Sequence, residues 1–184
     1  MDAPVKILIL AAGLGTRMKS KKAKVLHRAG GLALIEHVVD TALQLTGPDR
    51  IFAVVGHQAG QVEAAVEDRH VRFVRQEEQK GTGHAVMVAQ AATAPPEGLL
   101  LVLYGDIPLL SATTLRGLIK TQADSGGAAT VITTQLDDPT GYGRVIRDPD
   151  GGIRAVVEQK AATPEQLAIR EINAGIYVHF LSSI

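Results

Sequence analysis

The chain has 184 residues, 46% of them hydrophobic, which is enough for a full aliphatic core. Its 19 basic and 19 acidic residues cancel, which argues against nucleic-acid or membrane-surface binding through bulk charge. With no cysteine, neither a disulfide nor a thiolate site is possible. The apolar runs are strand-sized, and Asp2 stands where a signal peptide is basic, so we expect a cytoplasmic protein.

Apolar runs and helical periodicities alternate over the first two-thirds of the chain. The strands expected there are Val5–Ala12, Ile51–Val55, Val71–Val74 and Leu99–Tyr104. The helices expected there are 33–46, Gln61–Asp68, His84–Ala92 and Ser111–Ala123. The last of these strands is the most apolar and is therefore expected to lie centrally. Alternation of strand and helix predicts a parallel sheet with helices on both faces.

Antiparallel strands are expected in the last third of the chain. The elements predicted there are a strand at Ala128–Thr134, a hairpin of Val145–Arg147 and Ile153–Val157, a helical turn at Thr163–Ala168, and a strand at Ile172–Phe180. No repeat, low-complexity tract or linker interrupts the pattern. The sequence therefore predicts one α/β domain over residues 1–184, with a mostly parallel sheet and added antiparallel strands.

A glycine-rich turn follows the first predicted strand. The run Leu10–Met18 holds two glycines, a threonine and Arg17, and Lys24 follows seven residues after the arginine. Glycines let backbone N–H groups approach phosphate oxygens, and both cations stay charged near neutral pH. Met18 replaces the third glycine of a dinucleotide fingerprint, and no Walker A ending is present. The run indicates another kind of phosphate loop, or else an ordinary turn with two solvated cations.

Two further polar clusters follow predicted strands, at the sheet edge where α/β proteins bind ligands. Tyr104, Gly105 and Asp106 leave the central strand. A carboxylate there suits Mg²⁺, which takes few protein oxygens together with substrate phosphates; the alternative is an aspartate that caps a turn. Gln76 and the turn Gly81–Gly83 offer amide donors and acceptors to a planar base, or form a polar surface loop.

Other candidate groups are weaker when taken one at a time. Gly141, Glu158 and Asn173 supply acceptors of the kind that sugar hydroxyls need, although such isolated residues are more often structural. No two histidines have metal-ligand spacing, and no Gly-x-Ser-x-Gly elbow is present. The sequence therefore predicts neither a histidine metal site nor a serine hydrolase.

Together these residues resemble the sugar-nucleotide pyrophosphorylases, which are nucleoside-triphosphate:sugar-1-phosphate nucleotidyltransferases. The similarity is closest to bacterial bifunctional enzymes that join an N-acetylglucosamine-1-phosphate uridyltransferase domain to a glucosamine-1-phosphate acetyltransferase domain. The matching stretches are Leu10–Met18, Lys24–His27, Gln76 with Gly81–Ala85, Leu103–Leu109, Asp137–Arg144, Val157–Lys160 and Glu171–Gly175. They cover nearly the whole chain, and Asp137–Arg144 is the most specific of them.

The resemblance implies a doubly wound, Rossmann-like domain that transfers UMP from UTP to N-acetylglucosamine 1-phosphate. The products are pyrophosphate and UDP-N-acetylglucosamine, a precursor of cell-envelope polysaccharides. The resemblance implies a nucleotide site lined by Leu10, Ala11, Ala12 and Gly13, with Gln76, Gly81 and Thr82 around the uracil. It implies ribose and sugar contacts from Tyr104, Gly105, Gly141, Glu158 and Asn173, and a magnesium ion on Asp106.

The implied reaction needs no protein nucleophile, because a sugar phosphate oxygen attacks the α-phosphorus in line. Positioning and charge neutralisation then supply the catalysis. We expect Arg17 to stabilise charge on the leaving pyrophosphate and Lys24 to orient the phosphates. Losing one such contact is expected to cost about 2.7–4 kcal/mol, by analogy with a lost oxyanion-hole donor.

Three features depart from the family pattern. Ala23 stands where the family has proline before its lysine, so this loop is expected to be looser before ligand binds. Ala174 stands where threonine often follows the asparagine. The sequence stops at Ile184, before a later segment with a second magnesium ligand and before the trimeric acetyltransferase β-helix. We therefore expect a C-terminally truncated domain with weak or absent turnover.

Two alternatives stay open. One is a relative that uses another nucleotide or sugar, such as glucose 1-phosphate with dTTP or UTP, although Asp137–Arg144 argues against it. The other is a non-catalytic module that binds sugar nucleotides as a sensor, against which the intact Arg17, Lys24 and Asp106 speak.

Overall fold

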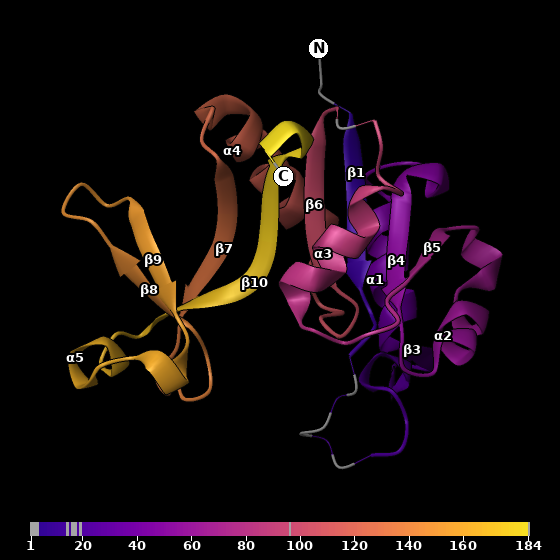
Figure 1. Ribbon diagram of the computed structural model, residues 1–184, viewed down its shortest axis with the longest axis horizontal. Helices are drawn as coiled ribbons and strands as arrows, with labels where there is room; N and C mark the ends of the chain where they lie inside the picture. The colour runs from indigo at the N-terminus through magenta and orange to yellow at the C-terminus, as the bar shows by residue number, and fades with distance from the viewer. Residues whose placement is uncertain (1–3, 14, 16–17, 19, 96, 184) are drawn as a thin grey trace. The chain divides into compact units, whose positions relative to one another are not determined.

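The computed structural model describes residues 4–13, 15, 18, 20–95 and 97–183 (Figure 1). Two compact units are present: unit 1 contains Met1–Thr130 and Tyr177–Ile184, and unit 2 contains Val131–Ile176. The long strand β10 (Glu171–Phe180) runs from unit 2 into unit 1. The expectation of a single domain over residues 1–184 stays a prediction.

Unit 1 is built on a sheet with the strand order β5–β4–β1–β6–β10. The first four strands are β1 (Val5–Leu10), β4 (Ile51–Val55), β5 (Arg72–Arg75) and β6 (Leu99–Tyr104). These four pair in parallel, whereas the end of β10 runs antiparallel to β6, with Tyr177 opposite Val102. Strand β6 lies between β1 and β10, so the central position expected for the most apolar run is confirmed.

Helices cover both faces of this sheet. They are α1 (Leu34–Leu43), α2 (Ala59–Ala65), α3 (Thr82–Gln90) and α4 (Ala112–Ser125). Figure 1 shows α3 on the viewer's side of β1 and β4, with α1 behind them. Successive strand residues point to opposite faces, so each strand supplies two sets of core side chains. The doubly wound α/β fold is therefore confirmed.

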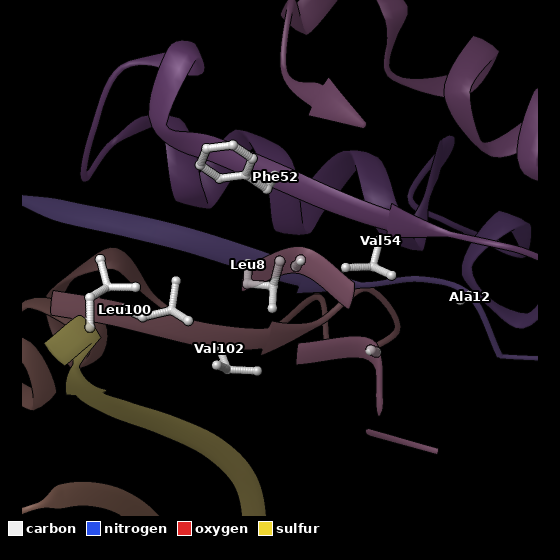
Figure 2. Close-up of a cluster of buried hydrophobic side chains, with 9 residues drawn as sticks. Leu8, Ala12, Phe52, Val54, Leu100 and Val102 are labelled. Atoms are coloured by element: carbon white, nitrogen blue, oxygen red, sulfur yellow. The ribbon is translucent and has the colours of Figure 1, made fainter. Parts of the chain in front are cut away.

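The two cores of unit 1 use alternate residues of the same strands. Under α3, Ala85 and Ala89 pack on a cluster that contains Leu8, Ala12, Phe52, Val54, Leu100 and Val102 (Figure 2). On the other face, Val38 of α1, Leu115 of α4 and Leu103 of β6 surround a small apolar void. Because both faces are buried, the strands are continuous apolar runs, the pattern from which they were predicted.

The expected elements are present, with boundaries within three residues of the expected ones. The first strand ends at Leu10 rather than Ala12. Helix α3 begins at Thr82, two residues before the expected start, because Gly81 turns the backbone with φ of 94°. A small hairpin of β2 (Arg28–Ala29) and β3 (Leu32–Ala33) was not expected, since two-residue strands leave no periodicity to detect.

Unit 2 is a set of paired strands with one short helix. Strand β8 (Arg144–Arg147) pairs antiparallel with both β9 (Ile153–Val157) and β10, and β7 (Ala129–Gln135) pairs with β10. Helix α5 (Pro164–Leu167) is capped by the Thr163 hydroxyl. The antiparallel character expected for the last third of the chain is confirmed. Across the described parts of the chain, no helix is long and apolar enough to cross a membrane.

Gly98, just before β6, is a position where the fold requires glycine. Its φ is +86°, and an added Cβ would lie 2.0 Å from the Pro4 carbonyl oxygen, which accepts the Leu99 N–H. We expect Gly98→Ala to lower the free energy of unfolding by about 2–4 kcal/mol, through backbone strain and overpacking. Urea unfolding followed by circular dichroism measures this loss.

Gly126→Ala is the matched control for that variant. Gly126 ends α4 with φ of +60°, but no atom lies within 4 Å of an added Cβ. This control carries the strain without the clash, so we expect a loss of about 1–2 kcal/mol. Equal losses in the two variants would show that the contact with Pro4 is not the cause.

Candidate functional site

Parallel pairing brings the loops after β1 and β6 to one edge of the sheet. Leu10 lies opposite Tyr104, and the Gly105 N–H donates to the Leu10 carbonyl oxygen at 3.0 Å. The polar loop that precedes α3 leaves the same edge of the sheet, where the Gln76 N–H donates to the Val55 carbonyl oxygen at 2.8 Å. A cavity of about 400 Å³ lies between these segments, a size typical of small-molecule sites.

Most of the predicted nucleotide-site residues line this cavity. They are Leu10, Ala11, Ala12, Gly13, Lys24, Gln76, Gly81, Thr82, Tyr104 and Asp106. Gly105 is buried beside it, where an added Cβ would lie 3.1 Å from a Val25 methyl group. The structure thus brings these residues together, and their roles as ligands stay predictions. Arg17, the predicted catalytic arginine, lies outside the described residues.

Four lining residues were not among the predicted site residues: Gly15, Val25, Gln79 and Ala85. Gly15 and Gln79 belong to the two polar loops that the sequence singles out, so proximity to those motifs was an available signal. Val25 and Ala85 are apolar and buried. Both lie within stretches that resemble the family, Lys24–His27 and Gly81–Ala85, but an apolar side chain there does not by itself indicate a place in the cavity wall.

Lys24 and Asp106 form an ion pair at the cavity. Lys24 starts a single 3₁₀ turn, Lys24–Leu26, whose other two side chains are buried. The backbone of Gly15 packs directly against this lysine, since an added Cβ would lie 2.9 Å from Lys24 Cβ. The Lys24 side chain is 46% exposed and that of Asp106 18%. The exposed lysine leaves the pair open to solvent on one side, where a ligand can approach both charges.

The Asp106 carboxylate fits one ligand of a magnesium ion. In the structure it already faces a cationic group, the Lys24 ammonium. Mg²⁺ is commonly bound through one or two carboxylates, with water and substrate phosphates completing its shell. Within the described part of the chain, no group of three or more His, Cys, Asp or Glu residues could hold a metal. The described donors therefore suit an ion that arrives with a nucleotide rather than a cage made by protein alone.

Gln58 holds the segment that leads to Lys24. The Ala23 N–H donates to Gln58 Oε1 at 2.7 Å, and Gln58 Nε2 donates to the Lys21 carbonyl at 2.9 Å. Ala23 is fully buried with φ of −54°, near the value that proline would impose. Gln58 thus supplies a restraint at the position where the absence of proline predicts a looser loop.

Neutral polar groups make up another part of the cavity wall. Gln76 is only 4% exposed, and its Nε2 donates to His84 Nδ1 at 2.9 Å and to the Gly81 carbonyl at 3.4 Å. Gln79 Nε2 donates to the Gln76 carbonyl at 3.2 Å. The hydroxyls of Thr82 and Tyr104 are 3.2 Å apart. This part of the wall offers hydrogen bonds without net charge, as an uncharged base would require.

Gly141, Glu158 and Asn173 form a second cluster, in unit 2. All three lie around Gly143, whose carbonyl oxygen accepts the Asn173 N–H at 3.0 Å. An added Cβ on Gly143 would lie 3.2 Å from Glu158 Oε1. Gln159 Oε1 accepts the Gly141 N–H. The structure therefore brings the three predicted sugar-site residues of unit 2 together around one loop.

The Gly141–Gly143 loop rests on a buried arginine. Arg144 is 2% exposed, and its guanidinium donates to the Tyr142 carbonyl and to Gln159 Oε1. The same guanidinium lowers the pKa of Asp138 a little, after the larger effect of the hydrogen bonds from Thr140. Arg144 therefore supports this loop through buried hydrogen bonds and does not face solvent.

Comparison with known proteins places these features in a family. Residues 7–164 match the MobA-like NTP transferase domain. Three curated relatives, each named bifunctional protein GlmU, are 57% identical in Solibacter usitatus, 51% in Burkholderia orbicola and 48% in Lactobacillus delbrueckii subsp. bulgaricus. The matches cover 93–96% of this chain. The chain spans only 37–38% of the length of these relatives.

Two solved structures share the fold. One, from Bacillus anthracis, is assigned as a glucose-1-phosphate thymidylyltransferase and was solved with a sucrose; it has a TM-score of 0.78 and 21% identity, over 97% of this chain and 72% of that one. The other is a CMP:2-keto-3-deoxy-manno-octonic acid synthetase complexed with CTP, with a TM-score of 0.71 and 19% identity, over 97% and 75%. At identities this low, the similarity shows a shared fold and nothing about the reaction.

The family match extends from within β1 to the first residue of α5 and therefore includes all the strand ends that form the cavity. The relatives of high identity align over 95–96% of the chain. On this basis the chain belongs to the family of MobA-like NTP transferase domains, which are nucleotidyltransferases.

Proposed function

We propose that this chain transfers UMP from UTP to N-acetylglucosamine 1-phosphate. The observation that carries the proposal is the cavity at the strand ends, where Lys24 and Asp106 supply charge and Gln76 supplies neutral hydrogen bonds. Nucleoside triphosphates have the same division into an anionic and a neutral part. The resemblance of Asp137–Arg144 to the N-acetylglucosamine enzymes supports the choice of sugar.

In the proposed complex, the uracil lies against Gln76, Gly81 and Thr82, and the triphosphate extends past Leu10–Gly13 towards Lys24. Asp106 would hold Mg²⁺, which when bound neutralises phosphate oxygens. Lys24 would orient the phosphates and, together with Arg17, stabilise the charge that develops on pyrophosphate. Tyr104 and Gly105 would contact the ribose.

The proposed chemistry is an in-line displacement. An oxygen of the sugar 1-phosphate forms a bond to the α-phosphorus of UTP, and the bond from that phosphorus to the α,β-bridging oxygen breaks. Gly141, Glu158 and Asn173 would bind the sugar hydroxyls. For the longer proteins that contain such a domain, the resemblance implies acetyl transfer to glucosamine 1-phosphate and a homotrimer, and both remain proposals.

A substrate panel tests the proposed reaction. We expect UTP with N-acetylglucosamine 1-phosphate to release the most pyrophosphate. Replacing UTP by dTTP, or N-acetylglucosamine 1-phosphate by glucose 1-phosphate, should lower the release. Calorimetry with UDP-N-acetylglucosamine, with and without Mg²⁺, gives a readout that does not depend on turnover. Magnesium-dependent binding of this product would support the site, and equal responses to all substrates, or no binding at all, would contradict it.

Asp106→Asn tests the magnesium site. The amide keeps the shape of the side chain but not its charge, so we expect the increase in UTP affinity that Mg²⁺ produces to fall about tenfold or more. Calorimetric titrations of UTP with and without Mg²⁺ measure this increase in affinity. Asp124→Asn removes an exposed carboxylate of α4 that pairs with Lys120, and should leave UTP binding unchanged. If Mg²⁺ raises UTP affinity equally in the wild type and in Asp106→Asn, the Asp106 carboxylate is not a ligand of the ion.

Gln58→Ala tests the restraint on the lysine loop. Losing the hydrogen bond to Ala23 is expected to weaken UTP binding about fivefold, because Lys24 must then be ordered by the ligand. Adding Ala23→Pro to this variant should restore affinity, since proline imposes nearly the φ that Ala23 already has.

Gln61→Ala, in the exposed first turn of α2, is the control for Gln58→Ala. We expect it to bind UTP as the wild type does. If Gln58→Ala also binds like the wild type, or if Ala23→Pro gives no recovery, the restraint does not act on Lys24.

A further inference from the structure

The side-chain amide of Gln76 has a defined orientation. The Gly81 carbonyl oxygen can only accept a hydrogen bond, so the amide atom 3.4 Å from it must be the donor Nε2. The same Nε2 lies 2.9 Å from His84 Nδ1. Both hydrogen atoms of the amide nitrogen are therefore used within the protein.

His84 Nδ1 must accept the hydrogen bond from Gln76. A neutral imidazole has one acceptor nitrogen and one N–H group, so its hydrogen is on Nε2. His84 is the third residue of α3 and is half-buried, so the helix sets where the ring lies. The acceptor nitrogen is consequently held in place beside Gln76.

The second atom of the amide, Gln76 Oε1, is left for the cavity. Among the described residues, no donor bonds this oxygen. It is also absent from the buried polar atoms that have no partner, so protein does not enclose it. Gln76 lines the cavity although its residue as a whole is 4% exposed. The atom that a ligand meets here is therefore an acceptor.

Backbone donors lie next to this acceptor. Gly81 and Thr82 line the same cavity, and the first N–H groups of α3 have no acceptor within the helix. The wall thus presents an acceptor beside donors. The pyrimidine edge of uracil is complementary, because its N3–H donor lies between two carbonyl acceptors. Cytosine has a lone pair at N3, which would face the lone pairs of Oε1.

We propose that His84 is a positioning residue that sets base specificity: by accepting from Gln76 Nε2, it holds the amide in the orientation that favours uracil over cytosine. The inference rests on the proposed function, since it assumes that the base lies against Gln76. His84 acts through Gln76 and not by contact with the nucleotide. Without its acceptor nitrogen, only the longer contact to the Gly81 carbonyl holds the amide, which can then turn more readily and present Nε2 to N3 of cytosine.

His84→Phe tests this proposal, because phenylalanine keeps a ring but has no acceptor. We expect wild-type protein with Mg²⁺ to bind UTP at least about tenfold more tightly than CTP, the discrimination of one well-placed hydrogen bond. In His84→Phe the ratio should fall to about threefold or less, chiefly through tighter binding of CTP. Calorimetric titrations with both nucleotides measure the ratio.

Two further variants separate positioning from a structural role. In the double variant Gln76→Glu with His84→Phe, either carboxylate oxygen is an acceptor, so the preference for UTP should return even if both affinities are lower. His37→Phe makes the same substitution on α1, where the ring bonds the Ala29 carbonyl, and should leave the ratio unchanged. Equal weakening of UTP and CTP in His84→Phe would overturn the proposal.

A measurement on the wild-type protein needs no variant. Imidazole ¹⁵N chemical shifts report which ring nitrogen carries hydrogen, and we expect His84 to have it on Nε2 alone; hydrogen on Nδ1 would overturn the inference. If wild-type protein binds neither nucleotide, the proposed function fails. If it prefers UTP and His84→Phe keeps the same preference, only the role of His84 fails.

Discussion

The parallel register of β1 and β6 is the constraint on which the site depends. Leu10 and Tyr104 pair at the ends of two strands that are far apart in the sequence, and the Gly105 N–H continues this pairing with a bond to Leu10. The strands are held in register by side chains buried on both faces, among them Leu8 and Leu101. A slip by one residue would turn these side chains to the wrong faces and separate the loops that form the cavity.

The cavity divides into a charged part and a neutral part. Lys24 and Asp106 form an ion pair whose lysine is about half exposed, so a ligand can reach these charges. On the neutral side, Gln76 is buried and its amide nitrogen is committed to protein partners. In the proposed complex, phosphate recognition would rest on groups that can rearrange, and base recognition on groups held by hydrogen bonds before any ligand binds.

Elements with a strong pattern were predicted well. Ile51–Val55 and Leu99–Tyr104 have the bounds expected from the sequence, because both faces of these strands are buried and polar residues or glycine end each run. The hairpin of β2 and β3 was missed because it is short and mostly exposed. Of the residues that line the cavity, Gly13 and Asp106 were singled out by their positions after strands, whereas the apolar side chains of Val25 and Ala85 gave no indication of a place there.

The sequence by itself determined the alternation of strands and helices, the antiparallel last third and the motifs that follow the strand ends, because these depend on local periodicity and residue type. Only the tertiary structure decided that Lys24 pairs with Asp106, that Gln58 holds Ala23, and that His84 orients Gln76. These are contacts between particular side-chain atoms. Whether two such atoms meet depends on sheet register and helix placement, which arise from burial across the whole unit and not from the residues that make the contact.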